Sequence, residues 1–499
     1  MIRINLPAAL LACALFVACS PHAPRQARDV TFPVAISPDY TGVTIPYNIA
    51  PLRFSILLDA EDYITVARGS LAGALTVRGK TARFPLKPWR RLLEANKGGS
   101  ILLEIYLRRD GEWLKLPRVR NHVSADPIDE YLAYRLIEPG YVHYRSIALR
   151  QRRLSSFEER DLYNNDIYPD DERRLCINCH SFQNYRTANM QFHGRGERGG
   201  TIIVREGHPV KVNLKVGDLV SGGVYPAWHP SEPLVAYSVS QTGQVFHSRD
   251  TRKVEVQDLS SDLILYDVAR NTVAYIASDT NELETFPAWS PDGETLYYAS
   301  APYVPTHPNH SWDAIVHYKE ICYNIVRRSF NPVSRQFGDA EVVYDAARAG
   351  KSATLPRVSP DGRYLLFTLG DFGTFHIWHP ESDLYLLDLR TGETRPLDPV
   401  NSPNTESYHS WSSNGRWIVF SSRRDDGSYT RSYIAHFDEE GRTSKPFILP
   451  QEDPALYDYL YKSFNVPEFM IEPVATSLPA FTSAFAAEAL DARPVMKEK

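Results

Sequence analysis

Five consecutive residues in the middle of the chain, Cys176-Ile177-Asn178-Cys179-His180, have the types and the spacing that could hold a haem covalently. In a helical turn the two thiols lie on one side, where they can add to the two vinyl groups of a haem. The imidazole that directly follows the second cysteine can then bond to the iron. The spacing therefore predicts a covalent haem site with Cys176 and Cys179 as the points of attachment and His180 as an axial ligand.

Two other kinds of site use a pair of cysteines at this spacing. A structural zinc site would need two further Cys or His ligands, and the 499-residue chain has no second pair of cysteines. A redox dithiol of the thioredoxin kind would need a βαβ context, which the surrounding sequence lacks. The haem interpretation is therefore preferred.

The residues after the motif are expected to supply the other face of the haem. Met190 has a thioether that can serve as a sixth ligand, and His193 is a rival. Ten residues can reach roughly 33 Å, so a loop from His180 to Met190 can pass round the ring edge. His208, another histidine or an open position are the alternatives, and a methionine is also a common core side chain.

The first eighteen residues predict a secretion signal, because Arg3 precedes an apolar run that is too short to span a bilayer. The run ends at Phe16-Val17-Ala18-Cys19, which resembles the lipobox of bacterial lipoproteins. The resemblance implies cleavage before Cys19 and attachment of lipid to it. Phe16 stands where that family usually has Leu, so cleavage by an ordinary signal peptidase is the alternative. Ser20 in place of Asp argues against retention at the inner membrane.

Export agrees with the haem prediction, because covalent haem of this type is attached outside the cytoplasmic membrane. We therefore expect an outer-membrane lipoprotein that faces the periplasm, joined to its anchor by a polar tether over residues 19–38. Surface exposure is an alternative. The net charge of −5, without long runs of one sign, predicts no nucleic-acid partner.

The elements that must position the motif are mostly β. Residues 39–150 predict a small β domain that contains a hairpin turning at Asp110-Gly111 and a short helix from Pro88 to Asn96. Residues 151–200 are expected to form a short helical haem-attachment segment. A Ser-x-x-Glu capping box at Ser155 predicts a helix at its start, and the glycine-rich stretch 194–200 is interpreted as a linker.

After residue 200 the chain repeats itself. Each copy has an apolar strand, a turn and a second apolar strand, which together could form the inner hairpin of a propeller blade. The turns are rich in Ser, Pro, Asp, Asn and Gly. The four copies begin at Tyr225-Pro226-Ala227-Trp228, Phe286-Pro287-Ala288-Trp289, Leu355-Pro356-Arg357-Val358 and Tyr408-His409-Ser410-Trp411.

These repeats closely resemble the β-propeller repeat of TolB-like proteins. The resemblance implies a β-propeller over residues 201–450, with four visible repeats and about six blades in all. Residues 451–499 are expected to form a helical tail, because Leu456, Tyr459, Leu460 and Phe464 recur at helical spacing. The predicted fold is thus a small β domain, a short helical haem-binding segment and a β-propeller.

Three functions are compatible with this organisation. The favoured one is single-electron transfer or redox sensing by one haem c on a propeller scaffold, with envelope or periplasmic proteins as partners. The alternative is a TolB-like protein-binding scaffold in which the haem segment is not catalytic. A haem peroxidase is a minor possibility that would need an open iron position and His193 as its acid-base group. A hydrolase is disfavoured, since no Gly-x-Ser-x-Gly elbow occurs.

Overall fold

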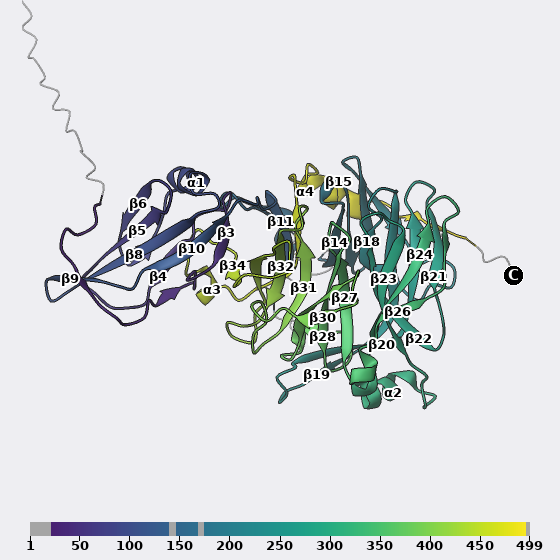
Figure 1. The fold of residues 1–499 in the computed structure, drawn as a ribbon. Helices are drawn as coiled ribbons and strands as arrows, with labels where there is room; N and C mark the ends of the chain where they lie inside the picture. The colour runs from purple at the N-terminus through teal and green to yellow at the C-terminus, as the bar shows by residue number, and fades with distance from the viewer. Residues whose placement is uncertain (1–20, 139–145, 168–173, 496–499) are drawn as a thin grey trace, which may run out of the picture.

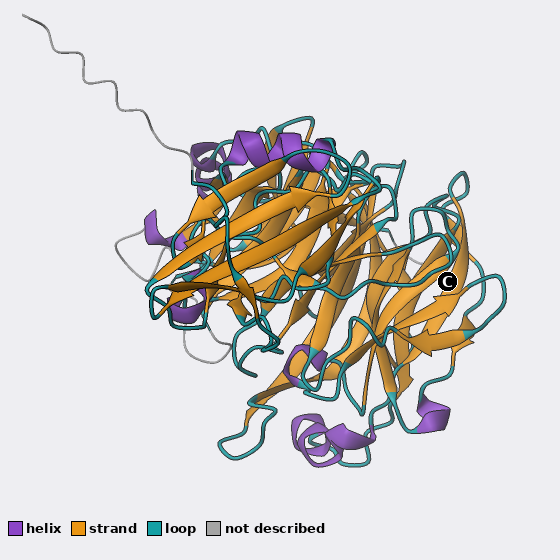
Figure 2. Ribbon diagram, turned by 60° about the vertical axis from the view of Figure 1, so that its left-hand side comes forward, coloured by secondary structure: helices purple, strands orange, loops and turns teal. Residues whose placement is uncertain are grey.

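The computed structural model describes residues 21–138, 146–167 and 174–495, and is built almost entirely from antiparallel sheets (Figures 1 and 2). The predicted signal over residues 1–18 and the lipidation site Cys19 lie outside these residues. Within the described residues, none of the helices has the length and the apolar composition needed to cross a membrane. The mostly β architecture agrees with the prediction and is consistent with a β-propeller.

The N-terminal part of the chain forms a seven-stranded sheet that lies at the left of Figure 1. Helix α1 (Leu86–Glu94) packs Trp89, Leu92 and Leu93 into its core. The predicted helix and the hairpin at Asp110-Gly111 are both confirmed. The strands of the sheet are β1 (Arg28–Asp29), β3 (Thr44–Pro46), β5 (Asp62–Gly69), β6 (Ala74–Arg78), β8 (Ser100–Arg109), β9 (Glu112–Lys115) and β10 (Val119–Ser124), and a second small sheet contains β2 (Ile36–Ser37), β4 (Phe54–Ile56) and β7 (Thr81–Ala82).

Two predicted boundaries in this part were wrong. The expected tether over residues 19–38 contributes β1 and β2, because their backbones pair with β9 and β4. The expected domain end at residue 150 cuts through a strand, β12 (Ala148–Arg153), which pairs with β11 (Tyr131–Ile137) in a different sheet. Long-range backbone pairing thus overrides the polar and turn-rich composition on which both boundaries were placed.

The sheet that contains β11 and β12 is completed from the far end of the chain. Its four strands follow the order β13 (Glu159–Asn164), β12, β11 and β35 (Ser463–Met470). Two helix predictions were therefore wrong, since the segment after Ser155 leads into β13 and residues 463–470 of the expected helical tail form β35. Two helices do occur in that tail, α3 (Leu456–Tyr459) and α4 (Leu478–Ala486).

The predicted helical haem-attachment segment is also a strand. The motif begins β14 (Cys176–Gln183), which pairs antiparallel with β15 (Arg186–Arg195). The glycine-rich stretch 194–200, which was expected to be a linker, forms the turn between β15 and β16 (Gly200–Arg205). Regular pairing of backbone groups across three strands outweighs the local pattern. The strands of this sheet are β14, β15 (Arg186–Arg195), β16 (Gly200–Arg205), β17 (His208–Asn213) and β36 (Leu490–Asp491).

The four sequence repeats form the remaining sheets, and each begins with the strand that carries the repeated motif. An inserted helix, α2 (His310–His317), packs against the long hairpin of β19 (Leu234–Phe246) and β20 (Val254–Asp267) at the bottom of Figure 1. The strands are β18 (Val224–Trp228), β19 (Leu234–Phe246), β20 (Val254–Asp267), β21 (Thr272–Ala277), β37 (Arg493–Pro494), β22 (Glu282–Trp289), β23 (Thr295–Pro302), β24 (Asn324–Asn331), β25 (Gln336–Phe337), β26 (Glu341–Tyr344), β27 (Ser352–Val358), β28 (Tyr364–Gly370), β29 (Asp383–Asp388), β30 (Thr394–Pro396), β31 (Glu406–Trp411), β32 (Trp417–Ser422), β33 (Arg431–His436) and β34 (Phe447–Ile448).

Six strands, here called the first strands, close a ring by contacting one another. Their order round the ring is β14, β18, β22, β27, β31 and β35, and β35 contacts β14. Each has a shift of register at the same point, just after a residue in the left-handed region of backbone conformation. These six residues have φ angles between 43° and 55°, and they are Cys179, Tyr225, Phe286, Leu355, Tyr408 and Val466.

One buried carboxyl on β22 makes a testable contribution to stability. Glu284 is 3 % exposed, and its Oε2 is buried without a hydrogen-bond partner. Burial, reinforced by Asp262, raises the pKa of Glu284 to about 8 from its ordinary 4.5. The folded protein therefore binds more protons than the unfolded chain between these two values, so this group's stabilising contribution is complete below pH 4.5 and is lost as the pH rises to 8.

We accordingly expect Glu284→Gln to increase the free energy of unfolding at pH 8 by about 1–2 kcal/mol, because the substitution removes a poorly solvated negative charge. Below pH 4.5 the gain should vanish. Urea unfolding at both pH values measures it. Glu282→Gln on the same strand is the control, since Glu282 already accepts a hydrogen bond from Ser300 at 2.8 Å. An equal gain in both variants, or one independent of pH, would contradict the assignment.

Candidate functional site

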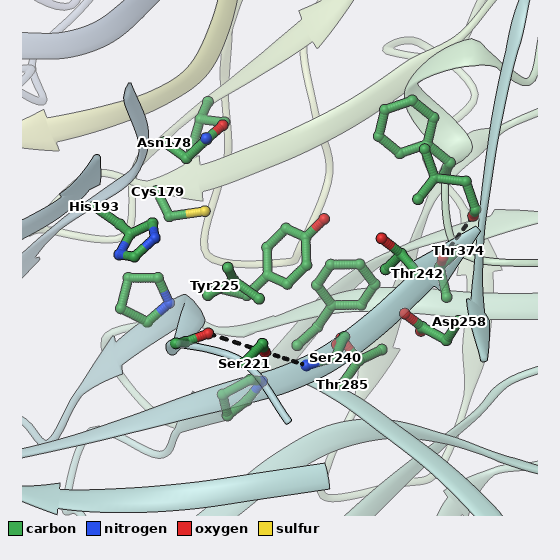
Figure 3. Close-up of a pocket in the computed structure, with 18 of the residues that line it drawn as sticks. Asn178, Cys179, His193, Ser221, Tyr225, Ser240, Thr242, Asp258, Thr285 and Thr374 are labelled. Atoms are coloured by element: carbon green, nitrogen blue, oxygen red, sulfur yellow. Dashed lines mark hydrogen bonds between the residues drawn. The ribbon is translucent and has the colours of Figure 1, made fainter. Parts of the chain in front are cut away.

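The ring of first strands surrounds a cavity of about 540 Å³, which is within the usual range for ligand sites (Figure 3). All six left-handed residues contribute to its wall. In Figure 3, Cys179 and His193 lie at one side of the cavity, Tyr225 at its centre and Asp258 with Thr242 and Thr374 at the other side. Residues that are uncommon in left-handed conformation, such as Val466, are held there by the ladders on both sides of each bulge.

The haem motif occupies the repeated position of its own strand. Four of the other five first strands have a proline directly after the left-handed residue, at positions 226, 287, 356 and 467. His180 takes that place after Cys179, and His409 takes it after Tyr408. In a regular strand the side chains of residues 178 and 179 would point to opposite faces. Because of the bulge, both Asn178 and Cys179 line the cavity.

The imidazole of His180 is buried in the wall of the cavity. Its side chain lines the cavity, and its Nε2 is buried without a hydrogen-bond partner. Burial, together with the positive charge of Arg135, lowers the pKa of His180 to about 3. The imidazole is thus neutral at every physiological pH, which is the form that binds a metal.

The two cysteines are arranged differently from each other. Cys179 lines the cavity, whereas Cys176 packs against an apolar cluster and its Sγ accepts a hydrogen bond from Asn178 Nδ2 at 3.3 Å. Both are free thiols. Since Asn178 also lines the cavity, the Cys176 thiol lies next to the wall that carries Cys179.

The two candidates for the sixth ligand lie on opposite faces of β15. Met190 is fully buried in the apolar cluster and does not line the cavity. His193 does line it, with Nδ1 3.1 Å from Thr201 Oγ1, and burial lowers the pKa of His193 to about 4. His208 is exposed at the start of β17. The structure therefore brings Cys179, His180 and His193 to one cavity and leaves Met190 and His208 outside it.

Sequence reasoning missed the cationic and acidic groups of the cavity. Arg135, Arg195, Lys215 and Arg357 contribute to its wall, against one carboxyl, Asp258. Asp258 accepts a hydrogen bond from Tyr323 at 2.9 Å, and burial raises the pKa of Asp258 to about 6. One signal was present in the sequence: Arg357 stands where two of the other repeats have alanine.

These residues fit a covalently attached haem. Nε2 of His180 lacks a hydrogen-bond partner, and His180 lines the same cavity as Cys179. The aromatic rings of Tyr225, Phe286 and Tyr408 contribute to the walls, and the cations of the wall could pair with the propionates of a haem. Cys176 fits less directly, because its thiol must turn away from the apolar cluster. Among the described residues no group of three or more His, Cys, Asp or Glu is arranged to hold a metal ion by itself.

Comparison with known proteins gives distant structural similarity. No protein-family model matches the sequence, and no curated protein is significantly similar to it. An oligogalacturonate lyase from Vibrio parahaemolyticus is 14% identical, with 82% of this chain and 99% of that chain aligned at a TM-score of 0.33. Prolyl oligopeptidase B from Galerina marginata is 9% identical, with 71% and 42% of the chains aligned at a TM-score of 0.37.

Proposed function

We propose that this protein carries one haem c, attached through Cys176 and Cys179 and bound axially by His180, and that it transfers single electrons or senses redox state. The observation that carries the proposal is the buried Nε2 of His180, which lacks a hydrogen-bond partner, in a residue that lines the same cavity as Cys179. A buried polar atom of this kind costs about 1–3 kcal/mol unless something binds it. His193, on the same cavity, is the preferred sixth ligand.

A bound haem would supply one-electron chemistry. The chain supplies its surroundings. The ring of strands keeps His180 away from bulk water, and burial keeps the imidazole neutral. The cations in the wall favour an anionic group in the cavity and stabilise added negative charge there.

We also propose six blades, each beginning with one strand of the ring, with the first blade closed by β35 from the end of the chain. The seven-stranded sheet then belongs to a separate N-terminal β domain. Anchoring through Cys19 would place the protein at the outer membrane facing the periplasm, where envelope or periplasmic redox proteins are the partners to be expected.

A protein-binding scaffold is the second candidate, and one observation favours it. Helix α2 exposes Trp312, Ile315 and Val316, with about half of each side chain open to solvent. An apolar group of this kind is typical of a contact surface. On this alternative the haem segment would have no redox role.

Paired absorption spectra of the protein, produced together with a cytochrome c maturation system, separate the two candidates. The reduced protein should show the bands of a thioether-linked haem, and the oxidised protein should lack a charge-transfer band from a Met-iron bond, because Met190 lies outside the cavity. Absence of the thioether bands would favour the scaffold. A Met-iron band that disappears in Met190→Ala would overturn the assignment of His193.

A further inference from the structure

Two arginines in the wall of the cavity, Arg135 and Arg357, form no ion pair with a carboxylate of the part of the chain that the structure describes. Arg135 donates from Nη1 to the carbonyl oxygen of Ile177 at 3.1 Å and to Asn178 Oδ1, while its Nε is buried without a partner. Arg357 is half-buried, and its guanidinium makes no ion pair with any described carboxylate within 4.0 Å, although the charge of Glu468 acts on it. A guanidinium cannot lose its charge to avoid the cost of burial, so an anion is needed to balance it.

The other charged groups leave this need unmet. Glu468 is the carboxyl that acts most strongly on Arg357, and both side chains line a second cavity of the ring, whereas Glu468 does not line the first; burial raises the pKa of Glu468 to about 7, so at neutral pH this carboxyl balances the charge of Arg357 only in part. Asp258 is engaged by Tyr323 on another part of the wall. Arg195 and Lys215 are exposed, where they can attract an anion from solution.

Both arginines lie at bulges of the ring: Arg357 directly follows the bulge of its own strand, and Arg135 lies opposite the bulge of β35. The register of β11 against β35 shifts between Ala133 and Arg135, and that of β27 against β28 shifts between Thr354 and Arg357. Bulges re-aim side chains in this way at functional sites. The planar fork of a guanidinium matches the two oxygens of a carboxylate. The volume of the cavity, about 540 Å³, leaves room for a much larger molecule than the carboxylate alone.

We propose that Arg135 and Arg357 form a binding subsite for the carboxylate of an organic anion in the cavity of the ring. Two sources can supply this group. One is a propionate of an attached haem, and this source rests on the proposed function. The other is a free organic acid, which would bind whether or not a haem is present.

Calorimetric titration of the full chain with benzoate tests the subsite, and benzamide serves as the neutral probe of the same shape. The unloaded protein is Cys176→Ser/Cys179→Ser. We expect it to bind benzoate and not benzamide. Arg135→Gln and Arg357→Gln should each weaken benzoate binding at least tenfold, since each removes charge-assisted hydrogen bonds. Arg348→Gln, at an exposed arginine that does not line the cavity, is the matched control and should change it less than threefold.

The haem-loaded protein distinguishes the two sources. If a propionate fills the subsite, benzoate no longer binds to the loaded protein; if the subsite serves a free acid, benzoate binds to loaded and unloaded protein alike. Equal binding of benzoate and benzamide, no binding by the unloaded protein, or unchanged binding in both arginine variants would overturn the proposal. Arg357→Lys, which keeps the charge and loses the fork, replaces Arg357→Gln if the latter does not fold. If the wild-type protein does not attach haem, the titration of the unloaded protein with benzoate still tests the subsite. Failure of the proposed haem attachment can therefore be told apart from failure of the subsite.

Discussion

Replacing His180 by proline is expected to abolish the spectrum of a His-ligated c-type haem while the polypeptide still folds. Proline is the natural residue at the equivalent position of four other first strands, at positions 226, 287, 356 and 467, so the backbone at the bulge accommodates it. The substitution removes the only imidazole that directly follows the second cysteine. Reduced and oxidised absorption spectra of the matured variant measure the loss.

The same substitution separates a ligand role from a structural one. In the unloaded protein His180→Pro removes a buried Nε2 that has no partner and also a hydrogen bond between the ring and the backbone of Val466, so the two effects offset each other and the free energy of unfolding should change by less than about 1 kcal/mol. The matched control is His409→Pro, at the equivalent position of the last repeat, which should retain the wild-type spectrum. It should cost about 1 kcal/mol, because His409 Nε2 bonds the carbonyl oxygen of Leu366 at 3.1 Å. A wild-type spectrum from His180→Pro would refute axial ligation.

Replacing Trp289 by alanine is expected to lower the free energy of unfolding by about 3–5 kcal/mol. Trp289 lies between two neighbouring repeats, where its Nε1 donates to the carbonyl oxygen of Ala227 at 3.1 Å. Its ring also contacts His229 and Phe330, with centroids 4.8 and 5.0 Å away. Alanine would lose the hydrogen bond and leave a cavity between the repeats.

Urea unfolding of the unloaded protein measures this effect. Trp289→Phe should cost about 1–2 kcal/mol, because it retains most of the apolar contact and loses the hydrogen bond. Trp312→Ala removes a tryptophan that is 51 % exposed on α2, so it should change stability by less than about 0.5 kcal/mol. If Trp289→Ala destabilises the protein no more than Trp312→Ala, the repeats are not held together by this residue.

The features that the sequence predicted correctly depend on local signals. The hairpin at Asp110-Gly111 and helix α1 need only a turn dipeptide, a proline and terminal glycines. The four repeats were visible because each keeps an apolar strand, a polar turn and a second strand. Periodicity over a few residues is sufficient for such elements.

The errors arose where distant segments pair. Val466-Pro467-Glu468-Phe469 repeats the pattern of the first strands, yet its neighbours Leu456, Tyr459 and Leu460 favoured a helix. It becomes a strand by pairing with β11, more than 300 residues earlier. In the same way the haem motif was expected in a helical turn, whereas its strand is fixed by β15 and β16.

The candidate site was predictable only in part. Cys179 and His180 were named from their spacing, and His193 from its nearness in sequence. Met190 lies outside the cavity, since alternation along β15 puts it on the opposite face from His193. Arg135 could not be found from the sequence, because it reaches the cavity from a strand that follows the N-terminal sheet.

The most direct test of the central claim is the mass of the denatured protein after production with a cytochrome c maturation system. We expect the mass of the polypeptide plus one haem, with neither Cys176 nor Cys179 open to a thiol reagent and Cys322 as the remaining free thiol of the described chain. An unmodified mass, with Cys176 and Cys179 both reacting as free thiols, would contradict it.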